Sequence, residues 1–248
     1  MRNILITLEY DGTGYHGWQK QKNALGIQEV VEEGIMAITG EKVGITGAGR
    51  TDAGVHALDQ KANFKTHSSI PVDKIPLALN SVLPRDIRII GAEEVSLDFH
   101  ARYNVIKKRY RYRIYNALFP TALFRNFCFH ISDKLDIGNM TLASEYLVGR
   151  NDYTAFCSTG SNVKTKVRTI EYIKITKEDN MIDIVVQADG FLYNMARIIA
   201  GTLVEVGKGN MEIQKVKEIL ERKDRRFAGP TLPPQGLYLE KVCYNQNS

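Results

Sequence analysis

Residues 47–57 form a short stretch with three glycines and a single acidic side chain, Asp52. Glycine adopts backbone conformations closed to other residues and lets a bulky ligand approach the main chain closely. We therefore expect a loop that presents Asp52, and a lone carboxylate presented in this way suggests covalent chemistry. Taken alone, such an aspartate is more often a turn residue that caps a helix or accepts backbone N–H bonds.

The segments on either side of this loop have the periodicity of regular structure. Apolar residues alternate over 4–10, which predicts a strand, and recur at helical spacing over 27–38, with Gly40 as the stop. Residues 60–65 alternate again. The candidate carboxylate therefore lies on a connection between framework elements.

The rest of the chain mixes strands and helices in the same manner. The pattern predicts a short helix over 75–83, a strand over 107–116, helices over 191–206 and 211–222, and a last strand over 237–244. This mixture fits an α+β fold better than regular βαβ winding.

Composition narrows the class of protein. The 248 residues contain no run near the roughly 18 apolar residues of a membrane span, and Glu9 follows too soon for an apolar signal segment, so we expect a cytoplasmic protein. Cys128, Cys157 and Cys243 are odd in number and widely spaced, which argues against disulfides and a structural zinc site. They are expected to be buried or inert thiols.

The formal charge of +5 permits a polyanionic partner without requiring one. Six basic residues and no acidic one fall within 102–113, where tyrosines alternate with arginines, and a second basic cluster lies at 222–226. Such a surface suits phosphates and base faces together. The alternative is a solvated strand face.

Six segments, in order along the chain, resemble the tRNA pseudouridine synthase A family, the TruA type. They are EYDG at 9–12 with GWQ at 17–19, GRTDAGVHA at 49–57, FHAR at 99–102, YRY at 110–112, GFLYNMAR at 190–197, and AGPT at 228–231 continuing to GLYL at 236–239. Ala196 and Tyr153 depart from the residues more usual in the family, and neither touches the chemistry.

The resemblance implies an isomerase that converts uridine to pseudouridine in the anticodon arm of tRNA, at positions thirty-eight to forty. By the same resemblance Asp52 is the nucleophile, Tyr110 stacks on the target uracil, Arg197 pairs with the aspartate, and Arg50 helps to open the stem or hold the flipped nucleotide. It further implies a homodimer that needs no metal or organic cofactor.

The fold that the resemblance implies is two α+β halves of the ferredoxin or RNA-recognition type. They share a continuous, mainly antiparallel mixed sheet, with helices on one side and a central active cleft. We expect the first half to cover residues 1–103 and carry the aspartate loop, and the second to cover 104–248 and carry Tyr110 and Arg197.

These residue types suit the reaction. A carboxylate attacks or stabilises an electron-deficient sugar carbon, or adds to the uracil ring, and so splits one difficult exchange into two easier steps. A nearby arginine favours the ionised form of that carboxylate. Stacking on an aromatic ring contributes about 1–3 kcal/mol toward holding an unstacked base. Backbone phosphates are expected to contact Lys107, Lys108, Arg109 and Arg111.

Each of these residues also has a plainer interpretation. By pattern alone Tyr110 is more often a core tyrosine than a stacking platform, as we expect of Tyr112, and Arg197 is otherwise a solvated helix residue. His56 lies near Asp52 and Asp59 in sequence, but further metal ligands are not evident. The glycine pair at 47–49 lacks the third glycine and the lysine of a nucleotide-binding loop.

Two other functions compete with the isomerase. The first is an RNA-binding or tRNA-chaperone protein that keeps the fold and has lost the reaction; the presence of Asp52, Tyr110 and Arg197 speaks against it. The second is a nucleosidase that hydrolyses free nucleosides, which would not need the basic and aromatic surface. The sequence does not specify the preferred uridine, the atom that Asp52 attacks, the group that removes the C5 proton or the dimer interface.

Overall fold

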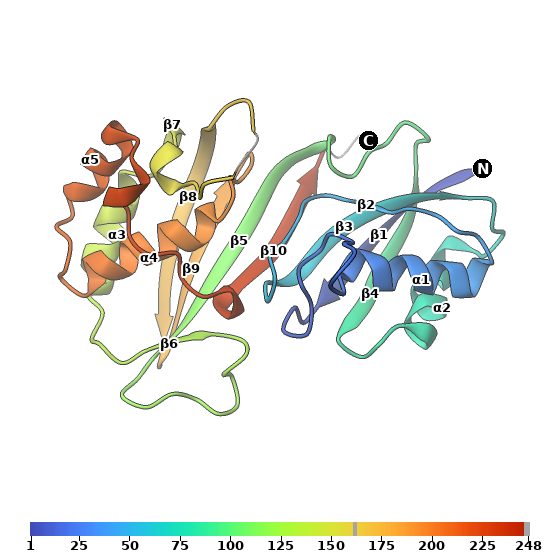
Figure 1. Ribbon diagram of the computed structural model, residues 1–248, viewed down its shortest axis with the longest axis horizontal. Helices are drawn as coiled ribbons and strands as arrows, with labels where there is room; N and C mark the ends of the chain where they lie inside the picture. The colour runs from blue at the N-terminus through green and yellow to red at the C-terminus, as the bar shows by residue number, and fades with distance from the viewer. Residues whose placement is uncertain (161–162, 246–248) are drawn as a thin grey trace. The chain divides into compact units, whose positions relative to one another are not determined.

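The computed structural model describes residues 1–160 and 163–245, and the chain forms two compact units, each built from strands and helices (Figure 1). Unit one contains Met1–Ile106 and the C-terminal strand from Tyr238 onward, and unit two is Lys107–Leu237. From the sequence we expected the boundary between the two halves at residues 103 and 104, with the last strand in the second half. That strand belongs with unit one because Tyr238 and Leu239 pair with His56 and Ala57.

Unit one is built around four strands in the order β4-β1-β3-β10. The antiparallel strands are β1 (Arg2–Tyr10), β3 (His56–Thr66) and β4 (Ile87–Val95), whereas β10 (Leu237–Tyr244) is parallel to β3. The short strand β2 (Thr46–Gly47) pairs with β3.

Two helices of unit one pack together on one side of this sheet, α1 (Ile27–Thr39) and α2 (Ile75–Val82) (Figure 1). Helix α1 buries Val31, Gly34 and Ile35, and a Cβ at Gly34 would come within 3.0 Å of the Leu83 side chain. Gly40 ends α1 in the left-handed conformation, with a φ of 73°, as the sequence predicted.

The main strands of unit two pair antiparallel in the order β5-β9-β8-β7. They are β5 (Val105–Asn116), β7 (Gly149–Asp152), β8 (Val167–Glu178) and β9 (Met181–Ala188), with the short β6 (Phe129–Ile131) parallel to β5. The helices of unit two are α3 (Ile137–Glu145), α4 (Met195–Gly207) and α5 (Lys215–Arg222). Helices α3 and α4 pack closely, because a Cβ at Gly207 would lie 2.7 Å from the Met140 sulfur.

The α+β class with mainly antiparallel sheets is confirmed, and two helix boundaries are corrected. Helix α4 begins at Met195 rather than at 191, because Asn194 has a left-handed backbone with a φ of 61° and a helix cannot continue through it. Helix α5 begins at Lys215 rather than at 211. The central cleft stays a prediction.

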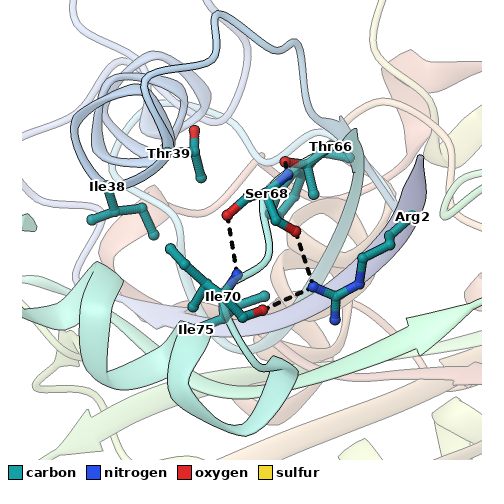
Figure 2. A pocket seen from close by; sticks show the side chains of 8 residues that line it. Arg2, Ile38, Thr39, Thr66, Ser68, Ile70 and Ile75 are labelled. Carbon is teal, nitrogen blue, oxygen red and sulfur yellow. Dashed lines mark hydrogen bonds between the residues drawn. The ribbon is translucent and has the colours of Figure 1, made fainter.

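A cavity of about 10 Å³ lies in unit one, close to the start of β1 (Figure 2). Arg2 donates two hydrogen bonds beside it, to the Ser68 and Ile70 carbonyl oxygens at 3.2 and 2.8 Å. This volume holds about one water molecule. The cavity therefore belongs to the packing of the unit and is too small for a nucleotide.

None of the helices in the described ranges has the length and apolar character needed to cross a membrane. The three cysteines are free thiols, and Cys128 and Cys157 are buried as predicted. Burial raises the pKa of the Cys128 thiol, which makes it less reactive.

Candidate active-site residues

The glycine-rich segment is a loop, as predicted, and it connects β2 to β3 in unit one. Asp52 is half-buried and Arg50 is exposed. A tight turn follows the aspartate: the Val55 N–H donates to the Asp52 carbonyl oxygen at 3.1 Å, and Gly54 has a φ of 76°. A side chain at position 54 would be strained in this conformation, so the turn after Asp52 depends on glycine.

The loop rests on the turn that follows β1. A Cβ at Gly12 would lie 2.0 Å from the Val55 carbonyl oxygen, and a Cβ at Gly17 would lie 2.4 Å from the Thr51 oxygen and 3.0 Å from the Asp52 carbonyl carbon. Gly17 also has a φ of 85°. The backbone on both sides of Asp52 therefore packs against the turn that follows β1. Only glycine at positions 12 and 17 allows the two segments to come this close.

Side-chain contacts fix the residue that precedes the aspartate. The Tyr10 hydroxyl and the Thr51 Oγ1 are hydrogen-bonded at 2.7 Å, and both side chains are buried. Burial holds the pKa of Tyr10 well above its usual value, so the phenol stays neutral. The Thr51 carbonyl oxygen accepts from the Trp18 N–H at 3.0 Å. Thr51 is thus tied to the framework through both its side chain and its backbone.

The start of the loop is anchored in a similar way. The Gln60 side chain donates to the Gly49 carbonyl oxygen at 2.9 Å, and the Ala48 N–H donates to the Lys61 carbonyl oxygen at 2.7 Å. Gly47 lies directly on the Trp18 ring, since a Cβ there would come within 2.6 Å of it. Arg50 itself donates from Nε to Gln19 Oε1 at 3.0 Å. The turn that supports the loop therefore also orients Arg50.

His56 holds the end of the loop. Its ring is buried, stacks on Tyr238 at a centroid distance of 4.9 Å, and accepts the Gly12 N–H at Nδ1 over 3.0 Å. The same nitrogen lies 3.2 Å from the Asp11 Oδ1. Within 1–160 and 163–245 no group of three or more His, Cys, Asp or Glu side chains is placed to hold a metal.

In unit two, β5 has the predicted alternation, with Tyr110, Tyr112 and Ile114 buried. Tyr112 is a core residue, as expected: its hydroxyl donates to the Pro233 carbonyl oxygen at 2.8 Å, and burial keeps its pKa far above the usual value. The Tyr110 and Phe191 rings pack in a T-shaped arrangement, with centroids 4.7 Å apart and planes at 72°.

Two of the predicted phosphate-binding cations on β5 have neighbours on β8. Lys107 pairs with Glu171, and this contact is the main reason that the pKa of Glu171 lies below its usual value. Arg109 donates to the Tyr172 hydroxyl at 3.4 Å. Lys108 lies opposite Ala188 of β9 in the register.

Asp183 of β9 lies beside the remaining arginines of β5. Arg113 makes a two-pronged contact with it, with Nε to Oδ1 at 2.8 Å and a terminal nitrogen to Oδ2 at 2.9 Å. Arg111 lies 3.7 Å from the same carboxylate. The cationic face predicted for β5 therefore carries acidic partners as well, so its net positive charge is smaller than the sequence of β5 suggests.

Arg197 lies in the first turn of α4 and is half-buried. Its Nε donates to the Leu232 carbonyl oxygen at 2.6 Å, and a terminal nitrogen donates to Asn194 Oδ1 at 2.8 Å. Asn194 is the residue with the left-handed backbone just before the helix. These bonds fix the plane of the guanidinium, so Arg197 is not a freely solvated helix residue.

The segment 228–233, here called the strap, runs along α4 and provides the Leu232 carbonyl. A Cβ at Gly201 would lie 1.9 Å from the Pro230 oxygen, and one at Gly229 would lie 2.5 Å from the Thr202 nitrogen. The Gly229 N–H donates to Thr202 Oγ1 at 2.9 Å. The two glycines therefore allow α4 and the strap to lie close together. At this separation the Arg197 side chain reaches the Leu232 carbonyl oxygen.

The basic cluster at 222–226 is largely engaged in local contacts. Arg225 donates to the Ala228 carbonyl oxygen and to Thr231 Oγ1 at 3.2 and 3.1 Å, and Arg226 pairs with Asp224 at 2.6 Å. Arg222 lies over the Phe227 ring at 4.8 Å. These contacts favour a structural role for Arg225 at the start of the strap.

Several residues that position the candidate side chains were not predicted from the sequence to have this role. They are Tyr10, Gly17, Trp18, Thr51 and Gln60 in unit one, and Asn194, Gly201, Gly229 and Leu232 in unit two. Most of them lie inside the segments that carried the family resemblance, and this position was the only indication in the sequence that they help to form the site. Asp52 belongs to unit one and Tyr110 and Arg197 to unit two, and their meeting in one cleft stays a prediction.

Comparison with known proteins decides the family. A family profile described as tRNA pseudouridine synthase matches residues 6–104 and 143–245. The chain belongs to this family. The tRNA pseudouridine synthase A of Caldicellulosiruptor saccharolyticus is 55% identical over 244 residues, which cover 98% of this chain and all of that protein.

Other relatives of this family are similar over the same length. The tRNA pseudouridine synthase A of Acetivibrio thermocellus and the tRNA pseudouridine synthase A 2 of Clostridium perfringens are each 52% identical over 244 residues, covering 98% of this chain and all of each protein. The resemblance noted in the sequence is thereby confirmed, and with it the assignment to a family of isomerases.

Proposed function

We propose that this chain isomerises uridine to pseudouridine in the anticodon stem-loop of tRNA, at positions thirty-eight to forty, with Asp52 as the nucleophile. The observation that carries the proposal is the clamped loop of unit one. The residues on both sides of Asp52 are fixed by Tyr10, Gly12 and Gly17, while its side chain is half-buried rather than packed in the core. Such preorganisation suits a group that must meet one reacting atom.

The reaction breaks the bond between ribose C1′ and uracil N1 and forms a bond between C1′ and C5. The electron pair of the first bond leaves with the uracil, N1 gains a proton, and C5 loses one. Asp52 stabilises the separated state, by attack on the sugar or on the base. Because uracil leaves as a resonance-stabilised anion, a second carboxylate acting as general acid is not required.

Arg197 and Tyr110 complete the proposed site. The bonds to Leu232 and Asn194 hold the Arg197 guanidinium in one plane, ready to pair with a carboxylate. Tyr110 packs against Phe191 and would stack on the flipped uracil. Arg50, exposed and oriented by Gln19, would hold the flipped nucleotide or the opened stem.

The tRNA backbone would contact Lys107, Lys108, Arg109 and Arg111. Because Glu171 and Asp183 lie beside some of these cations, phosphates would share them with carboxylates. Phosphate contacts carry little sequence information, so shape would dominate the recognition of tRNA. Following the family, we also propose a cytoplasmic homodimer that works without metal or organic cofactor.

The test uses an unmodified tRNA transcript carrying tritium at uracil C5, since C5 loses its tritium after it has bonded to C1′. Carbodiimide treatment followed by primer extension then locates the product. We expect tritium release with a stop in the anticodon arm for the wild type. Asp52→Ala should lose both signals and retain tRNA binding.

Each other outcome contradicts a named part of the proposal. Binding without tritium release by the wild type indicates the tRNA chaperone, and free uracil indicates the nucleosidase. Unchanged release by Asp52→Ala removes the nucleophile assignment. A primer-extension stop outside the anticodon arm keeps the isomerase and overturns the substrate position.

A further inference from the structure

The connection between β5 and β6 exposes an unusual amount of apolar surface. In residues 117–127, here called the apolar loop, the exposed fractions are 74% for Leu118, 74% for Phe119, 82% for Leu123 and 49% for Phe124. Figure 1 shows this loop reaching beyond the strand ends of unit two, beside the label β6. Single exposed apolar side chains are ordinary, whereas four in one short loop indicate an interaction surface.

The apolar loop is internally braced. The Phe124 N–H donates to Thr121 Oγ1 at 3.3 Å, the Phe127 N–H to the Phe124 carbonyl oxygen at 2.8 Å, and Arg125 to the Ala122 carbonyl oxygen at 2.7 Å. At its end the buried Cys128 thiol contacts the Phe124 carbonyl oxygen at 3.2 Å. A loop that already holds its conformation loses little entropy when a partner covers it.

Its charge argues against RNA as the partner. The sequence of the apolar loop is ALFPTALFRNF, in which Arg125 is the only charged residue. Surfaces that bind nucleic acid are strongly basic, because phosphate contacts supply much of the affinity. An apolar centre with an occasional arginine is instead typical of a protein interface.

The exposed area is of the size that a dimer needs. Taking about 200 Å² for a fully exposed large side chain, the four fractions correspond to about 550 Å² of apolar surface. A stable interface buries about 800 Å² on each partner. In a two-fold dimer one patch meets its own copy, so this loop with a modest polar rim supplies both halves of the contact.

We infer that the apolar loop is the surface through which two copies of this chain associate, with Leu118, Phe119, Leu123 and Phe124 at the centre of the contact. The inference rests on the homodimer of the proposed function and adds its location. The remaining loop side chains would form the rim, where Arg125 stays accessible to water.

The test measures the mass of the purified full-length protein by light scattering across a hundredfold range of concentration. The wild type is expected at twice the chain mass of 28.0 kDa. Leu123→Asp should weaken the dimer at least 100-fold and give the mass of one chain, and the variant should still fold because the side chain is 82% exposed. Phe119→Ser serves as a second change if that variant does not fold.

Leu77→Asp is the matched control, since Leu77 is 73% exposed on α2 of unit one. It should stay dimeric. A wild-type dimer that persists in folded Leu123→Asp, or one that Leu77→Asp dissociates, overturns the inference. A dimeric Leu123→Asp that has lost tRNA affinity would assign the loop to RNA. A monomeric wild type overturns both the location and the homodimer, while its tritium release still tests the catalytic proposal.

Discussion

Arg197 and Leu232 are hydrogen-bonded in both directions. The Arg197 Nε donates to the Leu232 carbonyl oxygen at 2.6 Å, and the Leu232 N–H donates to the Arg197 carbonyl oxygen at 3.4 Å. This reciprocal pair joins the first turn of α4 to the strap. The position of the arginine therefore depends on a segment more than thirty residues later in the chain.

Arg197→Lys should lower kcat by about 10–100-fold, the equivalent of losing about 1.5–3 kcal/mol of charged hydrogen bonding. A lysine has one nitrogen and cannot hold Leu232 and Asn194 in the planar arrangement of a guanidinium. Tritium release under saturating tRNA measures the effect, and Arg222→Lys on the exposed face of α5 is the control. Equal kcat for wild type and Arg197→Lys would show that the fixed guanidinium plane has no catalytic use.

Gly17→Ala should destabilise unit one by about 2–3 kcal/mol, because the new Cβ lies 2.4 Å from the Thr51 oxygen and the backbone has a positive φ. The backbone next to Asp52 must then move, so kcat should fall as well. Urea unfolding and tritium release measure the two effects. Gly14→Ala, in the same turn, meets no atom within 4 Å and should change neither quantity by much. The idea that Gly17 positions the aspartate loop fails if the two variants behave alike.

The structure explains which parts of this architecture could be predicted from sequence. Strands β1 and β5 and helix α1 have clear periodicity, and the predicted elements were found there. The hairpin of β8 and β9 was not predicted, although β9 alternates regularly in burial. Sequence motifs identified Asp52, Tyr110 and Arg197. The contacts that position their neighbourhoods were not predicted, because they join segments that are distant in the chain. They involve Tyr10, Leu232 and Gly201. Spacing in one segment does not encode such contacts.

The buried bond between Tyr10 and Thr51 can be measured by a double-mutant cycle with Tyr10→Phe and Thr51→Val. The two hydroxyls are 2.7 Å apart and both residues are buried, so we expect a coupling of about 1 kcal/mol in the free energy of unfolding. Because Thr51 precedes Asp52, each single variant should also lower kcat. Additive changes in unfolding free energy would show that the bond does not contribute to the stability of the loop.

We expect the Asp152 carboxylate to stabilise unit two at neutral pH and to lose this effect in acid. Its carboxylate accepts hydrogen bonds from the Thr154 hydroxyl and N–H at 2.7 and 3.0 Å, and Lys223, just after α5, lies 3.0 Å away. The Thr154 bond, and after it Lys223, hold the pKa of Asp152 below its ordinary value of 3.8. Because the pKa of Asp152 is lower in the folded state than in the unfolded state, the ionised carboxylate stabilises the fold above about pH 4. This contribution is lost as the pH falls through the folded-state pKa.

Asp152→Asn should therefore be less stable than the wild type by about 1 kcal/mol at neutral pH. The difference should shrink progressively below about pH 4, where the wild-type carboxylate also becomes neutral. Urea unfolding between neutral pH and about pH 3 measures this convergence, and Asp98→Asn, at an exposed position, reports the effect of net charge alone. A constant difference across the range would mean that the amide disturbs packing and that the ionised carboxylate contributes nothing.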